Sequence, residues 1–105
     1  MTTSQIDGVS VMTRANVYFD GKCVSHAITL PDGSRKSLGV VLPATLSFAT
    51  EVPEMMECVE GSCEYKLPGS ATWLTSSAGH KFSVGANARF EIRVSSAYHY
   101  ICHYG

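Results

Sequence analysis

The apolar residues of this chain alternate with polar residues over short segments, and this period of two constrains its fold more than any other feature. Between residues 89 and 94, Phe90, Ile92 and Val94 share one parity, and charged side chains occupy the other. Such alternation is typical of a half-buried β-strand, whereas an amphipathic helix repeats about every 3.6 residues. No window of about twelve residues has a helical apolar pattern. The chain is therefore predicted to be all-β.

Turn signals separate the alternating segments. Glycine and proline occur where turns need them, in PDGS at 31–34, EGS at 60–62 and PGS at 68–70. Strands are predicted at residues 22–30, 36–42, 45–50, 55–59, 63–67, 72–75, 80–84, 89–94 and 98–104. About nine to eleven short strands, with a turn roughly every 8 to 12 residues, are typical of sandwiches and barrels. Because a short chain with so many strands must hide its sheet edges, we expect a single β-barrel of jelly-roll type.

The composition is that of one small globular domain. The chain has 105 residues, of which 45% are hydrophobic and 16% are charged, and its net charge is −1. A charge so close to zero gives no attraction to nucleic acid or to anionic lipid. The longest apolar runs have about five residues, far fewer than the ~18 needed to cross a bilayer. No basic region followed by an apolar block marks a secretory signal, so a cytoplasmic protein is expected.

The first fifteen residues differ from the rest, because they are rich in Ser and Thr and carry few large apolar side chains. We therefore divide the chain into an N-terminal extension at 1–15 and a barrel domain at 16–105. Two interpretations of the extension remain. It is either a frayed tail, which we favour slightly, or residues 9–12 add an edge strand to the sheet, with a partner subunit as one candidate host.

The four cysteines do not form a recognisable metal or disulfide pattern. Cys23, Cys58, Cys63 and Cys102 include no CxxC pair, and in a cytosolic protein such residues are expected to be reduced and buried. A zinc site that combines Cys58 and Cys63 with a histidine is the alternative, although its spacing matches no known zinc motif.

The layout of hairpins and turns invites comparison with the two sequence motifs of the cupin barrel. The second motif, G-x5-P-x-G-x2-H-x3-N, places Phe90 where a metal-binding histidine would stand. The first, G-x5-H-x-H-x3,4-E-x6-G, begins at Gly39 and places Thr45 and Ser47 at its two histidines. Glu54 takes the carboxylate place when the distance to the last glycine, Gly61, is counted, whereas Glu51 fits the offset from Ser47 but not the distance to Gly61. One carboxylate cannot hold a catalytic metal ion alone, so no metal cofactor is expected.

The residues that remain predict a barrel mouth lined by hydroxyls, a carboxylate and a cation. The polar residues on or beside the segments that would face this mouth are Arg35, Ser37, Thr45, Ser47, Thr50 and Glu54. Aromatic residues that could stack on a flat ring are Trp73, Phe90, Tyr98, Tyr100 and Tyr104. An arginine with hydroxyls suits phosphate, and a carboxylate suits sugar hydroxyls. The alternative is that the hydroxyls are ordinary strand residues and that the aromatic rings only fill the core.

From residue 16 to residue 104, the chain resembles the small pyrimidine/purine nucleoside phosphorylases of bacteria, which are cupins. The matching pieces are N-x-Y-F-x-G-K at 16–22, S-R-K-S-L-G-V at 34–40, F-x-T-x-x-P-E-M at 48–55, T-W at 72–73, A-G-x-x-F-x-V at 78–84 and Y-x-C-x-Y at 100–104. The pieces are short, but their order and spacing together make the resemblance specific.

The resemblance implies a metal-free, homodimeric cupin that works as a pentosyltransferase, with inorganic phosphate as co-substrate and no cofactor. Such an enzyme converts a purine or pyrimidine nucleoside and phosphate to the free base and ribose 1-phosphate. The roles of individual residues are inferred here from their chemistry. Glu54 and Arg35 are the candidate catalytic residues, and the candidate substrate-binding residues are Ser37, Ser47, Thr50, Phe90 and Tyr100.

Three other functions fit the same pattern less well. A non-catalytic cupin could bind a sugar or a nucleotide in the same cavity, and this is the main alternative. A purely structural module would have a solid core and no cavity near Glu54 and Ser47. A metal enzyme with unconventional ligands would contain stoichiometric metal.

Overall fold

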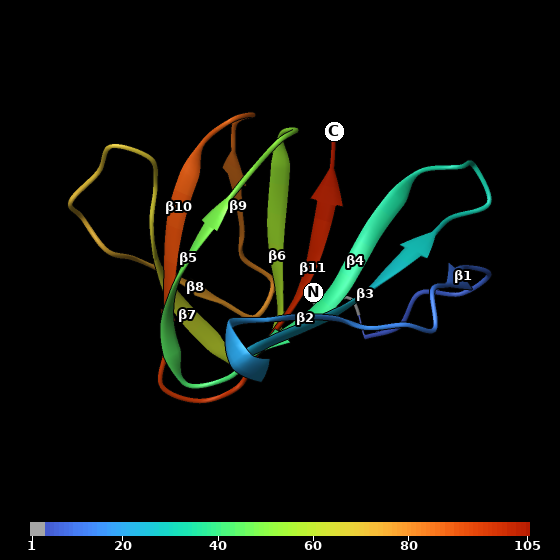
Figure 1. The fold of residues 1–105 in the computed structure, drawn as a ribbon, viewed down its shortest axis with the longest axis horizontal. Coiled ribbons are helices and arrows are strands. Elements are labelled where there is room, and N and C mark those ends of the chain that lie inside the picture. Colours follow the sequence, from blue (N-terminus) through green and yellow to red (C-terminus); the bar gives the residue numbers. More distant parts are fainter. Residues whose placement is uncertain (1–3) are drawn as a thin grey trace.

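Strands make up nearly all of the regular structure. The computed structural model describes residues 4–105, which form eleven strands and one short 3-10 helix, η1 (Figure 1). The elements are β1 (Ser10–Val11), β2 (Asn16–Tyr18), η1 (Phe19–Gly21), β3 (Cys23–Thr29), β4 (Arg35–Val41), β5 (Ala44–Ala49), β6 (Glu54–Glu60), β7 (Ser62–Lys66), β8 (Leu74–Ser77), β9 (Lys81–Val84), β10 (Arg89–Val94) and β11 (Tyr98–Tyr104). The all-β prediction is confirmed, and the nine predicted strands are present with ends that differ by no more than two residues.

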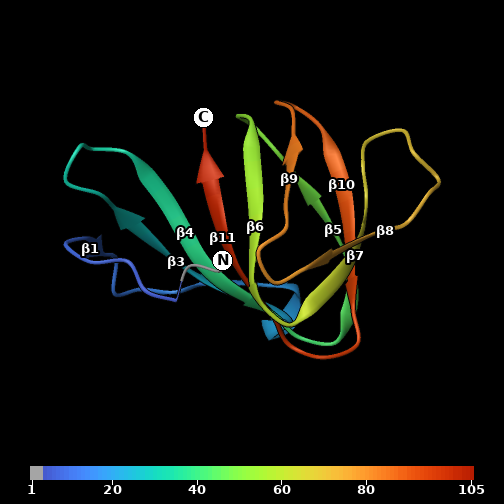
Figure 2. The same ribbon diagram turned by 180° about the vertical axis from the view of Figure 1, so that it is seen from behind.

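The strands form two antiparallel sheets. The larger has the order β1-β3-β4-β11-β6-β9, with β2 also paired to β3, and the smaller has the order β5-β10-β7-β8. Figures 1 and 2 show the sheets on opposite sides of the molecule, close together at the lower edge, where η1 lies, and further apart at the upper edge, where the C-terminus lies. The strand pairings of the described residues form two separate sheets, so closure into a single barrel stays a prediction.

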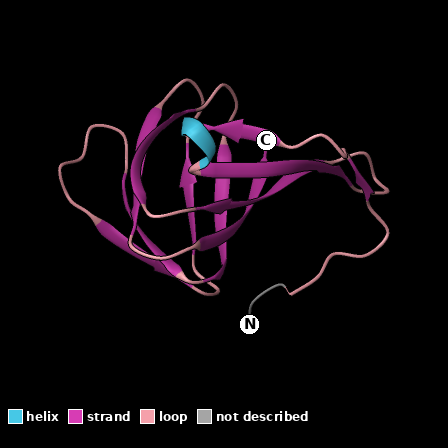
Figure 3. Cartoon of the chain, turned by 60° about the horizontal axis from the view of Figure 1, so that its bottom comes forward, coloured by secondary structure: helices cyan, strands magenta, loops and turns pink. Residues whose placement is uncertain are grey.

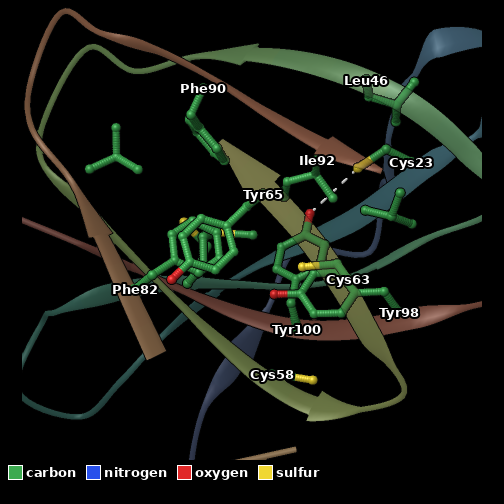
Figure 4. Packing of buried hydrophobic residues seen from close by; sticks show 14 residues of the cluster. Cys23, Leu46, Cys58, Cys63, Tyr65, Phe82, Phe90, Ile92, Tyr98 and Tyr100 are labelled. Atoms are coloured by element: carbon green, nitrogen blue, oxygen red, sulfur yellow. Dashed lines mark hydrogen bonds between the residues drawn. The ribbon is translucent and has the colours of Figure 1, made fainter. Parts of the chain in front are cut away.

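The core lies between the two sheets. Alternate residues of the strands point into this space, where the rings of Tyr65 and Phe82 stack with their centroids 3.8 Å apart. Figure 4 shows these rings beside those of Tyr98 and Tyr100. All four cysteines are buried and free.

The N-terminal segment covers an edge of the larger sheet. Ser10 and Val11 pair with Thr29 and Ile28 of β3 in the same chain, and the amide of Met12 donates to the carbonyl of Ala27 at 2.9 Å. Residues 10–11 are thus an edge strand of the chain's own sheet, which agrees with the second interpretation of the extension. Residues 1–3 of the extension lie outside the described residues, and the division at residue 15 stays a prediction.

No helix among residues 4–105 is long and apolar enough to span a membrane.

Candidate functional site

A cavity of about 280 Å³ lies between the two sheets. Alternation along β11 explains part of its wall, because Tyr100, Cys102 and Tyr104 share the parity that points between the sheets. Its lining residues are Tyr18, Phe19, Cys23, Ser25, Ser37, Ser47, Phe48, Ala49, Glu54, Met56, Phe90, Tyr100, Cys102 and Tyr104. Its volume is near the lower end of the roughly 300–1,000 Å³ of small-molecule sites. The cavity is large enough for a ligand of about the size of a nucleoside.

The larger sheet supplies a polar wall. Its register brings Ser37 of β4 beside Cys102 of β11, and Tyr104 of β11 beside Glu54 of β6. The hydroxyls of Ser37 and Tyr104 are 2.8 Å apart, and the Cys102 thiol donates to Glu54 Oε1 at 3.4 Å. Three strands that are distant in sequence thus bring a carboxylate and two hydroxyls together.

Burial sets the protonation of this wall. It raises the pKa of Glu54 above its ordinary value, although the bond from Cys102 opposes the rise. It also raises the pKa of Tyr104 to about 12 and that of Cys102 to about 12, and the nearby Glu54 charge adds to both. At neutral pH the tyrosine and the cysteine therefore stay protonated. Glu54 is the only carboxylate among the described residues that line the cavity.

A second cavity, of about 340 Å³, adjoins the first, and two cationic residues, Arg35 and Lys36, line it. The two share four lining residues, which are Tyr18, Ser25, Ser37 and Tyr104. Arg35 lines only the second cavity, and because it lies two residues before Ser37 on β4, both side chains point to the same face of the sheet. A guanidinium group beside hydroxyls is a suitable site for phosphate.

Aromatic rings form the opposite wall of the first cavity. Phe48 of β5 and Phe90 of β10 are partners across the strands, and their rings stack with centroids 5.6 Å apart. The ring of Phe19 in η1 meets Phe48 edge to face at 5.3 Å. Figure 3 shows η1, the one helix drawn, in cyan. On the larger sheet, by contrast, the ring of Tyr100 stacks on that of Tyr98, with centroids 5.8 Å apart. A flat ligand can therefore contact aromatic rings on one side and polar groups on the other.

The structure brings most of the predicted site residues to these cavities. Ser37, Ser47, Glu54, Phe90 and Tyr100 line the first cavity, and Arg35 lines the second. Several of their polar groups already have partners within the protein. The Ser47 hydroxyl accepts a hydrogen bond from Arg89 Nη1 at 3.2 Å, and the Tyr100 hydroxyl lies 3.5 Å from the Cys23 sulfur (Figure 4). The Ser37 and Tyr104 hydroxyls are engaged with each other, but that hydrogen bond uses only one of their two hydrogens.

Thr50 lines neither cavity. Its hydroxyl donates to the Gly85 carbonyl at 2.6 Å and accepts from the Ala88 amide at 3.0 Å. These bonds tie the end of β5 to the loop before β10.

Sequence reasoning missed several lining residues. Phe48 lies in the strand predicted at 45–50, but its pairing with Phe90 depends on the β5–β10 register. Tyr104 was considered only as a ring for stacking, although its hydroxyl is the closest partner of Ser37. Phe19 lies in a turn just after β2, where no strand or helix pattern marks it.

The donor groups of the first cavity do not fit a catalytic metal ion. Among residues 4–105, no three His, Cys, Asp or Glu side chains converge as a metal site requires. The potential ligands in the first cavity are the Glu54 carboxylate and the thiols of Cys23 and Cys102. Burial raises the pKa of both thiols, which disfavours the thiolate that a metal ion would need. No chemical step is therefore derived through a metal.

The family model and the full-length relatives that match this chain all point to one family. The model of the family described as pyrimidine/purine nucleoside phosphorylase matches residues 13–104. The pyrimidine/purine nucleoside phosphorylase of Paracidovorax citrulli is 69% identical over 105 residues, which is 100% of both chains. That of Ralstonia pickettii is 67% identical over 104 residues, which is 99% of both chains.

Solved structures of other proteins have the same fold. A protein of unknown function from Acinetobacter sp. ADP1 superposes with a TM-score of 0.96 at 40% identity, covering 98% of this chain and 100% of that one. An RmlC-like cupin from Shewanella frigidimarina superposes with a TM-score of 0.69 at 14% identity, covering 88% of this chain and 82% of that one, which shows likeness of fold alone. The fold is therefore cupin-like, and with its full-length relatives and its family match the chain belongs to the pyrimidine/purine nucleoside phosphorylase family.

Proposed function

We propose that the protein is a nucleoside phosphorylase that accepts both purine and pyrimidine nucleosides. It is a pentosyltransferase, which moves the ribosyl group from the base to inorganic phosphate and needs no metal ion. Two findings support this function. The relatives that match over the full length carry that name, and two adjoining cavities suit the two substrates.

The observation that carries the proposal is the shared wall of the two cavities. The nucleoside occupies the first cavity, with its base against the aromatic wall. Phosphate occupies the second, where Arg35 and Ser37 bind its oxygens. Ser37 and Tyr104 line both cavities, so phosphate bound there lies next to the sugar. Holding both reactants at one boundary supplies the proximity that a two-substrate displacement needs.

The chemistry follows from the charges at this boundary. The bond between C1′ and the base nitrogen breaks with its electron pair leaving on the base, and a phosphate oxygen forms the new bond to C1′. The sugar carries positive charge in the transition state, and the Glu54 carboxylate and the phosphate anion stabilise it. The leaving base takes up a proton, and Tyr104, whose raised pKa keeps it protonated, is suited to donate a hydrogen bond nearby.

We propose different contributions for the other predicted residues. Phe90 and Tyr100 contact the nucleoside through their rings, and Ser47 contacts it from the edge strand β5. Because the Thr50 hydroxyl is bound by Gly85 and Ala88, Thr50 supports the cavity wall and does not bind phosphate directly.

Three further expectations accompany the function. The two sheets close as a jelly-roll cupin barrel, the protein is cytoplasmic, and it is a homodimer. Support for the homodimer comes from the exposed apolar side chains of Val11 and Val17 at the edge of the larger sheet, which are 53% and 62% exposed.

The direct test is base release from inosine and from uridine by chelator-treated protein, with and without phosphate. The proposal predicts release from both nucleosides only when phosphate is present. Release without phosphate would indicate a hydrolase. Tight binding of nucleosides without release would favour a non-catalytic cupin. As a second test, Arg35→Ala is expected to raise the KM for phosphate more than the KM for the nucleoside.

A further inference from the structure

A turn with an unusual backbone places an aromatic ring at the first cavity. Phe19, Asp20 and Gly21 of η1 have φ angles of 53°, 54° and 88°. Positive φ is easy for glycine, uncommon for other residues and an outlier for a residue as bulky as phenylalanine. Two of the three left-handed positions therefore carry side chains that strain the backbone. Glycine would relieve this strain at either position.

The hydrogen bonds that hold this turn are made by its backbone. The amide of Lys22 donates to the carbonyl of Phe19 at 3.1 Å, and the amide of Leu42 donates to the carbonyl of Lys22 at 2.7 Å. Tyr18 pairs with Cys23 at the base of the hairpin, and η1 has no side-chain cap. A glycine at position 19 would keep all of these bonds. The turn itself therefore does not require phenylalanine.

The ring of Phe19 extends the aromatic wall of the cavity toward solvent. It contacts Phe48 edge to face at 5.3 Å, and Phe48 in turn stacks on Phe90. Phe90 is buried, whereas Phe19 is 43% exposed and lies outside the buried core cluster. The ring thus stands between solvent and the space where the base would lie. Backbone strain that persists in such a place is characteristic of functional sites.

We propose that Phe19 is a base-binding residue that closes the aromatic wall over the base of the nucleoside. The inference rests on the proposed function and adds a residue to its site. Phe19 holds the base by contact with its flat face. Every nucleobase has such a face, so stacking accepts purines and pyrimidines alike, whereas hydrogen bonds to the ring edge would select between them.

The test compares two glycine variants by calorimetry, using uracil and hypoxanthine as ligands in the absence of phosphate. Phe19→Gly removes both the strain and the ring. Asp20→Gly relieves similar strain one residue later, where the side chain lines neither cavity. We expect Phe19→Gly to weaken base binding on the order of tenfold, and more for hypoxanthine than for uracil because its ring system is larger. Asp20→Gly is expected to bind both bases as the wild type does.

Thermal melting completes the test. Both glycine variants should melt at or above the temperature of the wild type, because each relieves a strained position. If Phe19→Gly binds both bases as tightly as Asp20→Gly, the proposal is wrong. It is also wrong if Phe19→Gly melts far below Asp20→Gly, because the ring would then be part of the core.

Binding and turnover are measured separately, so a failure of this proposal can be distinguished from a failure of the proposed function. If the wild type releases base only with phosphate while Phe19→Gly keeps the wild-type KM for inosine and uridine, only the role of Phe19 is refuted. If the wild type binds no base and releases none, both proposals fail.

Discussion

Replacing Gly39 with alanine tests the packing beneath the candidate site. Gly39 lies opposite Tyr100 in the β4–β11 pair. A Cβ atom at this position would meet the Tyr100 ring at 2.4 Å, whereas carbon atoms in contact are ordinarily about 3.5–4.0 Å apart. The ring would have to move by about 1 Å or more. The buried ring of Tyr98 stacks on Tyr100 at 5.8 Å, so the direction left open is into the cavity.

The expected loss of stability follows from two opposing effects. Overpacking a well-packed core costs about 1–3 kcal/mol. Alanine restrains the unfolded chain more than glycine does and recovers about 0.5–1 kcal/mol. With the middle of each range, the net loss is about 1 kcal/mol, which lowers the Tm of a domain of this size by roughly 4–8 °C. Because the displaced Tyr100 ring enters the cavity, the KM for the nucleoside should rise as well.

Thermal unfolding and steady-state kinetics measure both effects. Gly85→Ala is the matched control, because a Cβ atom there meets nothing within 4 Å, so it should lose no stability and leave the KM unchanged. A second control places Gly39→Ala in a Tyr100→Val background, where the overlap is absent and the alanine should no longer destabilise. A Gly39→Ala protein as stable as the wild type would refute the reasoning, and so would an equal loss in the Tyr100→Val background.

Three further predictions concern single side chains. Burial raises the pKa of Glu54 in the folded protein, so its protonation favours folding, and this contribution is lost as the pH rises through the folded pKa. Glu54→Gln should therefore melt above the wild type at pH 7 but not near pH 4, while kcat falls about 100-fold. Ser37→Ala removes the partner of Tyr104, and kinetics should show a KM for phosphate raised about tenfold, with little change for the nucleoside. Thr50→Val breaks two hydrogen bonds, and denaturant unfolding should show a loss of about 1–3 kcal/mol with an unchanged KM for phosphate.

The alternation of residues predicts where the strands are, but not which face of each strand points into the space between the sheets. In β3, Val24, His26 and Ile28 share one parity, yet Cys23 and Ser25 point between the sheets. Ile28 is nevertheless fully buried, although it lies outside the core cluster between the sheets. The period of two is local, whereas the choice of inner face depends on which segments cover the sheet. Nothing in the alternation of residues 22–30 carries that information.

The sequence likewise predicts some residues of the candidate site but not the contacts between them. Ser37 was predicted as a hydroxyl on a segment that would face the barrel mouth and Glu54 from motif spacing, and both lie at the first cavity. Their contacts with Tyr104 and Cys102 depend on pairing between β11 and two strands far away in sequence. Phe19 was missed because a left-handed turn carries no periodic signal, and a phenylalanine is not a residue from which positive φ is expected.

The most direct test of phosphorolysis in this cavity is to follow uridine and inorganic phosphate by ³¹P NMR after adding the chelator-treated protein. The account predicts that a sugar phosphate ester appears in the same amount as the free base, for the wild type but at a greatly reduced rate for Glu54→Gln. Free base without the ester, or a Glu54→Gln protein as fast as the wild type, would contradict it.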